Sequence, residues 1–263
     1  MQDLRVSIVQ SPLHWEDAGT NRSMFATKLA ALQGITDLVV LPEMFTTGFS
    51  MRSADLAETM DGPTVQWMRE QAKAIDAAIY GSVIIAGNGR YYNRGLFVQP
   101  DGTVTSYDKR HLFRFANETD HYSAGSDRVI VQWRGWRILL QICFDLRFPV
   151  FQRNGNGTTE PDYDALLNVA NWPEVRRHPW STLLLARAIE NQCYVVGVNR
   201  VGTDANDLPY SGDSVIVDPR GAVLAAVQPG TDGVATAVLD RAALTDFRAK
   251  FPVALEADGF ALR

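Results

Sequence analysis

Short apolar segments recur along the whole chain, and what lies between them limits the folds that it can adopt. The segments that read as strands are RVSIVQ, DLVVL, AIYGSVIIAG, RGLFVQ, RVIVQW, RILLQICF, DALLNVA, CYVVGVN, SVIVD, AVLAAV and GVATAVLD. The helical patterns NRSMFATKLAALQ and PTVQWMREQAKAI, which start after Asn or Pro, separate some of them. The tight-turn signals PDGT, PRGA and WRGWR join others as hairpins. This mixture predicts an α/β fold of mixed sheets, most simply two stacked sheets with helices outside.

The size and charge of the chain indicate a single enzyme-sized domain with a small partner. With 263 residues, 46% hydrophobic and 21% charged, it can bury a sizeable core, and we expect one domain over residues 1–263. The formal charge of −5, spread without long like-charged runs, argues against nucleic acid or an anionic membrane as partner. We therefore expect a small-molecule substrate.

The length of the apolar runs, the N-terminal pattern and the cysteine content indicate where the protein is located in the cell. No window approaches the ~20 apolar residues of a membrane span, and the start MQDLRVSIVQ has no secretory pattern. Cys143 and Cys193 are too few for a disulfide scaffold and suggest a reducing compartment. We expect a cytoplasmic protein. The histidines lack metal-ligand spacing, so no metal is expected; they are His14, His111, His121 and His178.

Three side chains of complementary chemistry follow strand-like runs. Glu43 follows LVVLP, Lys109 follows SYD and Cys143 follows RILLQI, and the carboxyl ends of strands are where catalytic groups collect in α/β folds. A cysteine attacks as its thiolate and needs a base, for which a desolvated Glu43 is suited. Lys109 and the backbone N–H of Phe144 could then hold the charge on a carbonyl oxygen. Together they outline a thiol hydrolase.

Each of these residues also has an ordinary structural interpretation. Taken alone, Cys143 could be an inert buried hydrophobe, as most free cysteines are, and Lys109 lies in a charged cluster typical of a solvated turn. Cys193 has no acid or base nearby in sequence, so core packing is expected for it. The combination of acid, amine and thiol in this order favours the catalytic interpretation for Cys143 and Lys109.

The order PEMFTTGF, YDKRHLF and CFDLRFP resembles the nitrilase superfamily of carbon-nitrogen hydrolases, and NWPEVRRHPWSTLLLARAIENQCYVVGVNRVG resembles its omega-amidase branch. The resemblance implies a four-layer α-β-β-α sandwich, a homodimer or larger homo-oligomer, and no metal or organic cofactor. It also implies that Glu118, in FANETDHY, is a second glutamate that positions the lysine and the substrate.

The chain departs from this family pattern at two places. Many relatives carry an acid where Val150 stands, so a supporting contact in that helix is expected to be absent. The stretch QRNGNGTTEPDYD, residues 152–164, reads as a longer polar loop than the branch usually has. Because of this longer loop, the contacts at the rim of the site are expected to differ from those of the branch.

Several further residues are candidates for contact with the substrate. Asn171 and Trp172 follow the strand ALLNVA, and Phe49 lies beyond Glu43, so an aromatic wall is expected. Arg176 and Arg177 could bind a substrate carboxylate or be solvated rim charges. Three other charged side chains have structural alternatives. Arg147 could pair with Asp145 or a sheet-edge carbonyl or contact substrate, and Arg187 and Glu190 fit a helix-surface or interface pair.

The sequence thus predicts an amidase that forms a cysteine thioester and releases ammonia. The branch resemblance implies a short dicarboxylate monoamide as substrate, such as 2-oxoglutaramate or 2-oxosuccinamate. A nitrile or carbamoyl compound is the alternative within the same chemistry. A catalytically idle binding subunit is a second alternative, and a thiol redox sensor, which needs a resolving cysteine, is a third.

Overall fold

The computed structural model describes residues 2–155 and 160–259, which form two six-stranded mixed sheets. The first has the order β14-β1-β2-β3-β4-β5, with bounds Gly233–Leu239, Leu4–Gln10, Leu38–Val40, Ala78–Gly87, Arg90–Val98 and Val104–Asp108. The second has the order β13-β12-β9-β8-β7-β6, with bounds Val223–Ala226, Val215–Val217, Tyr194–Asn199, Ala165–Ala170, Trp136–Ile142 and Ile130–Trp133. The inner neighbours β1, β2 and β3, and likewise β7, β8 and β9, run parallel.

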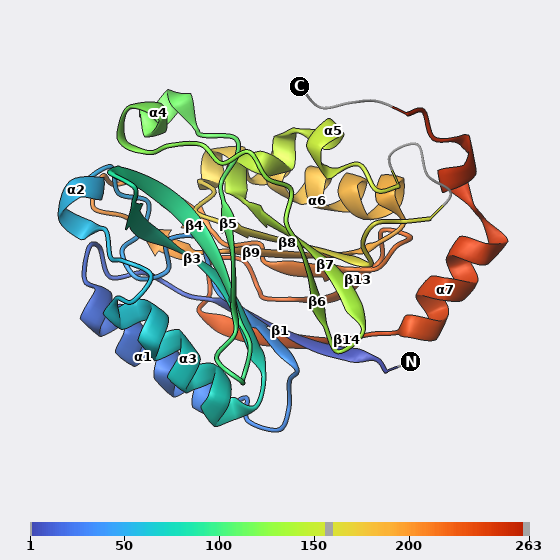
Figure 1. The fold of residues 1–263 in the computed structure, drawn as a ribbon, viewed down its shortest axis with the longest axis horizontal. Coiled ribbons are helices and arrows are strands. Elements are labelled where there is room, and N and C mark those ends of the chain that lie inside the picture. Colours follow the sequence, from blue (N-terminus) through green and yellow to red (C-terminus); the bar gives the residue numbers. More distant parts are fainter. Residues whose placement is uncertain (1, 156–159, 260–263) are drawn as a thin grey trace.

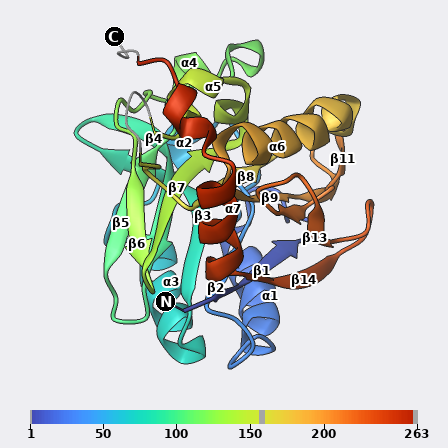
Figure 2. The ribbon, with the colours of Figure 1, turned by 90° about the vertical axis from the view of Figure 1, so that its right-hand side faces the viewer.

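Helices cover the outer faces of the two sheets. Figure 1 shows α1 and α3 together beside the first sheet and α6 on the far side of the second. In Figure 2 both sheets lie between these helices, and α7 lies in front of the sheets in this view. The helix bounds are α1 Ala18–Ala30, α2 Ser53–Leu56, α3 Pro63–Ile75, α4 Glu118–His121, α5 Pro149–Gln152, α6 Arg177–Asn191 and α7 Arg241–Lys250. The predicted α-β-β-α sandwich is therefore confirmed.

Burial on both faces explains why the inner strands read as continuous apolar runs. In β2, Leu38 and Val40 point into the core between the sheets, whereas Val39 packs with the residues of α1 and α3. Side chains alternate across a strand, so each run supplies two cores at once. None of the helices in the part of the chain that the structure describes is long and apolar enough to cross a membrane.

The predicted hairpins and one predicted helix are found where the sequence placed them. PDGT joins β4 to β5, WRGWR joins β6 to β7, and PRGA joins β12 to β13. The pattern PTVQWMREQAKAI forms α3. The other helix begins at Ala18 rather than after Asn21, because the Asp17 carboxylate caps it by accepting the Thr20 N–H at 3.0 Å. The short hairpin of β10 (Val201–Thr203) and β11 (Pro209–Ser211) was not predicted.

The expected long polar loop over 152–164 is only partly a loop. Residues 156–159 lie outside the described residues. Gln152 belongs to α5 and is buried, and Asn154 is buried against Asn191, whose side-chain oxygen accepts its N–H at 2.9 Å. None of the described residues of this stretch lines the cavity at Cys143, so its described part packs on α6 rather than forming a rim. Val150 is exposed.

Asp164 ties α7 to the start of β8. Its buried carboxylate pairs with Arg137 at 2.8 Å, Arg241 at 2.7 Å and Arg248 at 2.8 Å. Burial alone would raise the pKa of this carboxyl, but hydrogen bonds from Arg137 and Arg241 outweigh it and hold the pKa well below its usual range. The ionised form therefore stabilises the fold above the unfolded pKa of about 3.9.

We expect Asp164→Asn to lower the free energy of unfolding by about 3 kcal/mol at pH 7, because it leaves three partly buried guanidinium groups without the charge of their buried partner. The folded pKa is depressed, so the stabilisation is lost as pH falls below about 4, and the difference between variant and parent should shrink there. Urea unfolding at pH 7 and pH 3 measures both. Asp246→Asn, which removes an exposed pair with Lys250, is the control. Equal losses from both substitutions at pH 7 would contradict the prediction.

Candidate active site

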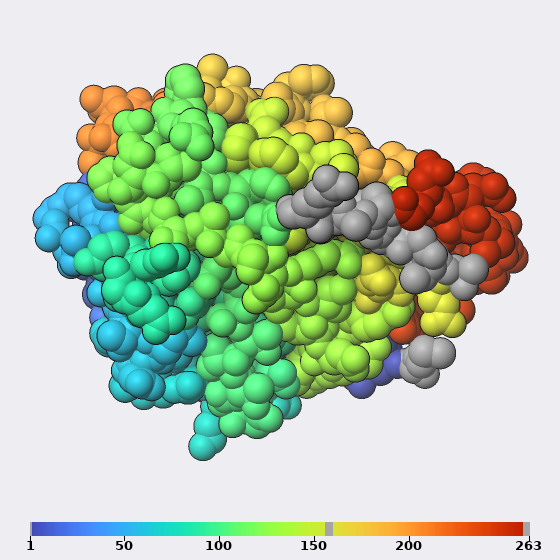
Figure 3. All heavy atoms as spheres, turned by 45° about the horizontal axis from the view of Figure 1, so that its top comes forward, coloured from blue at the N-terminus to red at the C-terminus, as the bar shows by residue number. Residues whose placement is uncertain are grey.

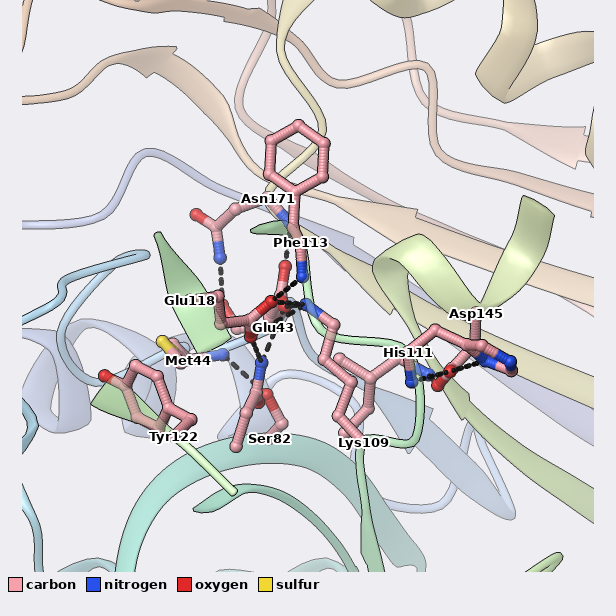
Figure 4. Close-up of polar contacts among 12 residues, drawn as sticks. Glu43, Met44, Ser82, Lys109, His111, Phe113, Glu118, Tyr122, Asp145 and Asn171 are labelled. Carbon is pink, nitrogen blue, oxygen red and sulfur yellow. Dashed lines mark hydrogen bonds and ion pairs between the residues drawn. The ribbon is translucent and has the colours of Figure 1, made fainter. Parts of the chain in front are cut away.

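Two carboxylates and one ammonium group meet near the carboxyl ends of β2 and β5. Glu43 follows β2, Lys109 follows β5, and Glu118 begins α4. Lys109 Nζ lies 2.9 Å from Glu43 Oε1 and 3.0 Å from both carboxylate oxygens of Glu118 (Figure 4). All three side chains are completely buried. The structure thus brings together an acid, an amine and the second acid that the sequence singled out.

Residues of both sheets hold the turn that carries Glu43. Across the sheet interface, Asn171 donates its backbone N–H to Glu43 Oε2 at 2.7 Å and its side-chain amide to the Glu43 carbonyl at 2.5 Å (Figure 4). Met44 has a φ of 42°, a conformation uncommon outside glycine, and donates its N–H to Ser82 Oγ at 2.8 Å. These contacts fix the direction of the Glu43 carboxylate.

The electrostatics of the cluster keep Lys109 charged. Burial alone lowers the pKa of Lys109, but the neighbouring charges of Glu118 and Glu43 raise it well above its ordinary value. Burial raises the pKa of Glu118, and the charge of Lys109 opposes that effect. Glu118 Oε2 also accepts the Phe113 N–H at 2.5 Å. A permanently charged ammonium group is therefore held in a site closed to bulk water.

Cys143 lies at the first position after β7, on a turn over Cys143–Arg147. Its φ of 47° is a strained conformation for a residue with a side chain, and such strain concentrates at functional sites. Burial raises the pKa of the Cys143 thiol, the negative charge of Glu43 raises it further, and the positive charge of Lys109 opposes both effects. The thiol is therefore protonated at rest and needs a base to become a nucleophile.

Asp145 joins the lysine-bearing segment to the cysteine-bearing turn. Its buried carboxylate accepts the Tyr107 hydroxyl at 2.7 Å, the His111 N–H at 2.9 Å and the Ile142 N–H at 3.1 Å. Its Oδ1 also lies 2.7 Å from His111 Nδ1 (Figure 4). The carboxylate is thus occupied, and Arg147 makes no pair with it, contrary to one interpretation of the sequence.

A cavity of about 230 Å³ opens above Cys143. Aromatic side chains form most of its wall, namely Phe49, Phe113, Phe115, Phe144, Trp172 and Tyr210. Among the described residues, the charged groups that line it are Arg147 and Arg176. In Figure 3 the green segment that carries α4 lies beside the yellow-green segment that carries α5 on the face turned toward the viewer.

Both lining arginines are stacked on aromatic rings. The Arg147 guanidinium lies 5.0 Å from the centre of the Trp172 ring, and it has no ion pair in the part of the chain described. Arg176 lies 5.3 Å from both Phe113 and Phe115. Stacking leaves the N–H groups at the edge of each guanidinium available to an anion. The cavity is therefore apolar with a positive charge balance.

The structure gathers most of the predicted substrate contacts but not all. Phe49, Phe144, Asn171, Trp172 and Arg176 line the cavity. The ring of Phe49 also lies 5.1 Å from Lys109 Nζ. Arg177 does not reach the cavity.

Arg177 and Arg187 lie elsewhere than the sequence suggested. Arg177 pairs at 2.6 Å with Asp213 at a partly exposed position. The predicted pair of Arg187 with Glu190 exists at 2.9 Å, but the arginine is 3% exposed and so does not lie on the helix surface. Arg187 donates to the carbonyl of Leu146 at 2.6 Å and so supports the turn that follows Cys143. Its burial on the inner face of α6 explains the difference.

Comparison with known proteins identifies the class of protein. The family model described as carbon-nitrogen hydrolase matches residues 5–249. The omega-amidase YafV of Escherichia coli K12 is 48% identical over 262 residues, and the 2-oxoglutaramate amidase of Bacillus subtilis is 35% identical over 221. These alignments cover 100% of this chain and of YafV, and 82% and 83% of this chain and of the Bacillus protein.

The comparison with solved structures agrees. The structure of XC1258 from Xanthomonas campestris, a CN-hydrolase superfamily protein with an arsenic adduct in its active site, has a TM-score of 0.97 and is 49% identical over 100% of both chains. Nit3 of Saccharomyces cerevisiae, a nitrilase superfamily member, has a TM-score of 0.84 and is 25% identical over 96% and 95% of the chains. The chain belongs to the carbon-nitrogen hydrolase family, within the nitrilase superfamily.

Proposed function

We propose that this enzyme is an omega-amidase that hydrolyses the terminal amide of a short dicarboxylate monoamide, such as 2-oxoglutaramate or 2-oxosuccinamate. The observation that carries the proposal is a buried Glu-Lys-Cys cluster beneath a small cavity whose charged lining is positive. A cavity of this size suits a small substrate, and its arginines suit a free carboxylate. The names of the Escherichia and Bacillus relatives support this substrate class.

In the proposed mechanism, Glu43 takes the proton of the Cys143 thiol as the sulfur attacks the amide carbon. The carbonyl oxygen becomes an oxyanion between Lys109 Nζ and the backbone N–H of Phe144. Glu43 returns the proton to the nitrogen, the C–N bond breaks, and ammonia leaves a thioester on Cys143. Water then gives a proton to Glu43 and attacks the thioester, which frees the acid and restores the thiol.

The geometry supports each of these roles. The charge of Glu43 acts on the Cys143 thiol, so this carboxylate is the nearby base that can take the thiol proton. Lys109 stays charged between Glu43 and Glu118, so the donor for the oxyanion is present before the substrate arrives. Glu118 makes two contacts of 3.0 Å with Lys109 Nζ, which suits a positioning role.

We expect a strong preference for a monoamide acid over its methyl ester, because the guanidinium groups at the cavity can form charge-assisted hydrogen bonds with a carboxylate but not with an ester. Arg147→Met should lower kcat/KM for the acid about 10- to 100-fold, the equivalent of one lost hydrogen bond to a charged group, and hardly change the rate for the ester. Steady-state assays of ammonia release from both compounds measure this. Arg177→Met, outside the cavity, is the matched control.

Two results would revise this specificity. Equal rates for acid and ester in the parent enzyme would remove the omega-amidase assignment and leave a general amidase. A preference that survives Arg147→Met but not Arg176→Met would assign the carboxylate to the arginine beside Phe113 and Phe115. A panel of ω-amides, plain amides, nitriles and carbamoyl compounds tests the alternatives that use the same thiol.

We further propose that the chain, as one catalytic domain over residues 1–263, works in the cytoplasm as a homodimer or larger homo-oligomer without a cofactor. The family resemblance supports the assembly, and the two unpaired cysteines fit a reducing compartment. An idle binding subunit would not need this cluster of buried charges. A search for a thioester adduct on Cys143 by intact-mass spectrometry separates that alternative from the amidase.

A further inference from the structure

A buried asparagine bridges the two carboxylates of the site. Asn93 lies in the interior of β4 and is completely buried. Its side-chain amide donates to Glu43 Oε1 at 2.7 Å and to Glu118 Oε1 at 3.3 Å. The Asn93 carbonyl accepts the backbone N–H of Lys109 at 3.0 Å. One residue is therefore bonded to all three charged members of the cluster.

These hydrogen bonds occupy both acceptor positions of one carboxylate oxygen of Glu43 and leave one acceptor position on the other oxygen. Oε1 accepts from Asn93 at 2.7 Å and from Lys109 at 2.9 Å, which occupies both lone-pair positions of that oxygen. Oε2 accepts the N–H of Asn171 at 2.7 Å and keeps one position. The open position lies on the oxygen that Asn171 orients from the second sheet, the sheet that also carries Cys143.

We propose that Asn93 is a positioning residue that, together with Lys109, saturates Oε1 of Glu43, so that Oε2 accepts the proton of Cys143. The inference rests on the proposed thiol chemistry and adds which oxygen of the base works.

A purely structural role does not account for this residue. Asparagine is disfavoured in strand interiors, where β-branched and aromatic residues pack better. The Asn93 side-chain oxygen has no hydrogen-bond partner among the described residues, and a buried acceptor without a partner is costly. The opposite orientation of the amide would turn that oxygen toward two carboxylates. The site therefore uses the NH2 group, and the unpaired oxygen follows from that orientation.

The test compares Asn93→Leu, which has no donor, with Asn93→Asp, which has nearly the same shape but no N–H. We expect kcat for the best amide of the panel to fall on the order of 10- to 100-fold in both, the scale of a misplaced catalytic group. KM should stay within about threefold, because the change does not alter uniform substrate binding. Asn93→Ala, which cannot clash, should behave like the leucine variant.

A second readout needs no substrate. The rate at which iodoacetamide alkylates Cys143, followed by peptide mass mapping, reports its thiolate as pH is varied. The charged groups that act on this thiol are Glu43, Lys109 and Glu118. Loss of the Asn93 donor leaves the charge of the carboxylates less compensated, so forming a thiolate beside them is harder. The alkylation profile should therefore move to higher pH in both variants, and further for Asp.

Asn168→Leu provides the matched control. Asn168 is a completely buried strand asparagine of β8 whose amide atoms have no partner among the described residues. Its replacement removes no hydrogen bond to the catalytic cluster, so it should leave both kcat and the alkylation profile unchanged. A parent-like kcat and an unshifted profile in Asn93→Leu would overturn the proposal, as would a loss of activity that Asn168→Leu reproduces. Failure of the thiol mechanism itself is distinguishable, because activity would then survive removal of Cys143.

Discussion

Cys143→Ala should abolish amide hydrolysis, with a loss of at least about 10⁴-fold, because the residue that forms the covalent intermediate is gone. The fold should persist, since a thiol-to-hydrogen change removes little volume and Cys143 is already 8% exposed. Ammonia release per mole of folded enzyme measures the first effect, and thermal unfolding the second. Residual activity above a few per cent would contradict the assignment of the nucleophile.

Cys193→Ala is the matched control for that experiment. Cys193 is completely buried in the core formed by the two sheets and α6, and it has no contact with the catalytic cluster. Its replacement should lower the free energy of unfolding by about 1 kcal/mol through a small cavity. The rate per folded molecule should not change. A comparable loss of rate in both variants would indicate that packing, and not chemistry, is being measured.

Glu43→Gln should be almost as damaging, on the order of 10³-fold or more in kcat, because one carboxylate acts as base, acid and base again in a single turnover. The glutamine keeps the length of the side chain and one acceptor oxygen for the donors around it. Activity should therefore fall without a comparable fall in stability. Steady-state kinetics and urea unfolding of the same preparation measure the two effects.

The double variant sharpens the test of Glu43. Residues that act as one unit lose activity non-additively, so Glu43→Gln combined with Cys143→Ala should be scarcely worse than either change alone. Losses that multiply would mean that Glu43 acts independently of the thiol, as a structural acid.

The layered fold could be predicted because its causes are local. Periodicity defined α3, and Gly-containing turns such as the one at Gly135 defined hairpins. The order of strands could not be predicted in the same way. Pairing of β14 with β1 joins Leu239 to Leu4, the opposite ends of the chain, and a contact so distant in sequence leaves no local signal.

The candidate site divides along similar lines. The strand ends at Glu43, Lys109 and Cys143 could be found because polar residues follow apolar runs there. Neighbouring arginines could not be assigned, because adjacent residues at the start of a helix face different directions. Arg176 therefore lines the cavity whereas Arg177 pairs with Asp213.

Asn93 is a site residue that the sequence analysis did not identify, although the sequence of its strand contains a signal. An asparagine in the interior of the strand RYYNRGLFV disagrees with strand propensity, and such a disagreement is a marker of function. Its partners could not be named from sequence, because Glu43 and Glu118 reach it only through the fold.

The catalytic cluster is assembled from both sheets, and this has a consequence for how activity reports on the molecule. Glu43 and Lys109 belong to the first sheet and Cys143 to the second, while Tyr80 spans the layer beneath them by donating to the carbonyl of Gln141 at 3.0 Å. Sliding one sheet over the other by a fraction of an ångström changes the separation of thiol and base without altering either strand. The turnover number therefore depends on how the two sheets are aligned. Substitutions of side chains buried between the two sheets should change the rate without altering the residues that line the substrate cavity.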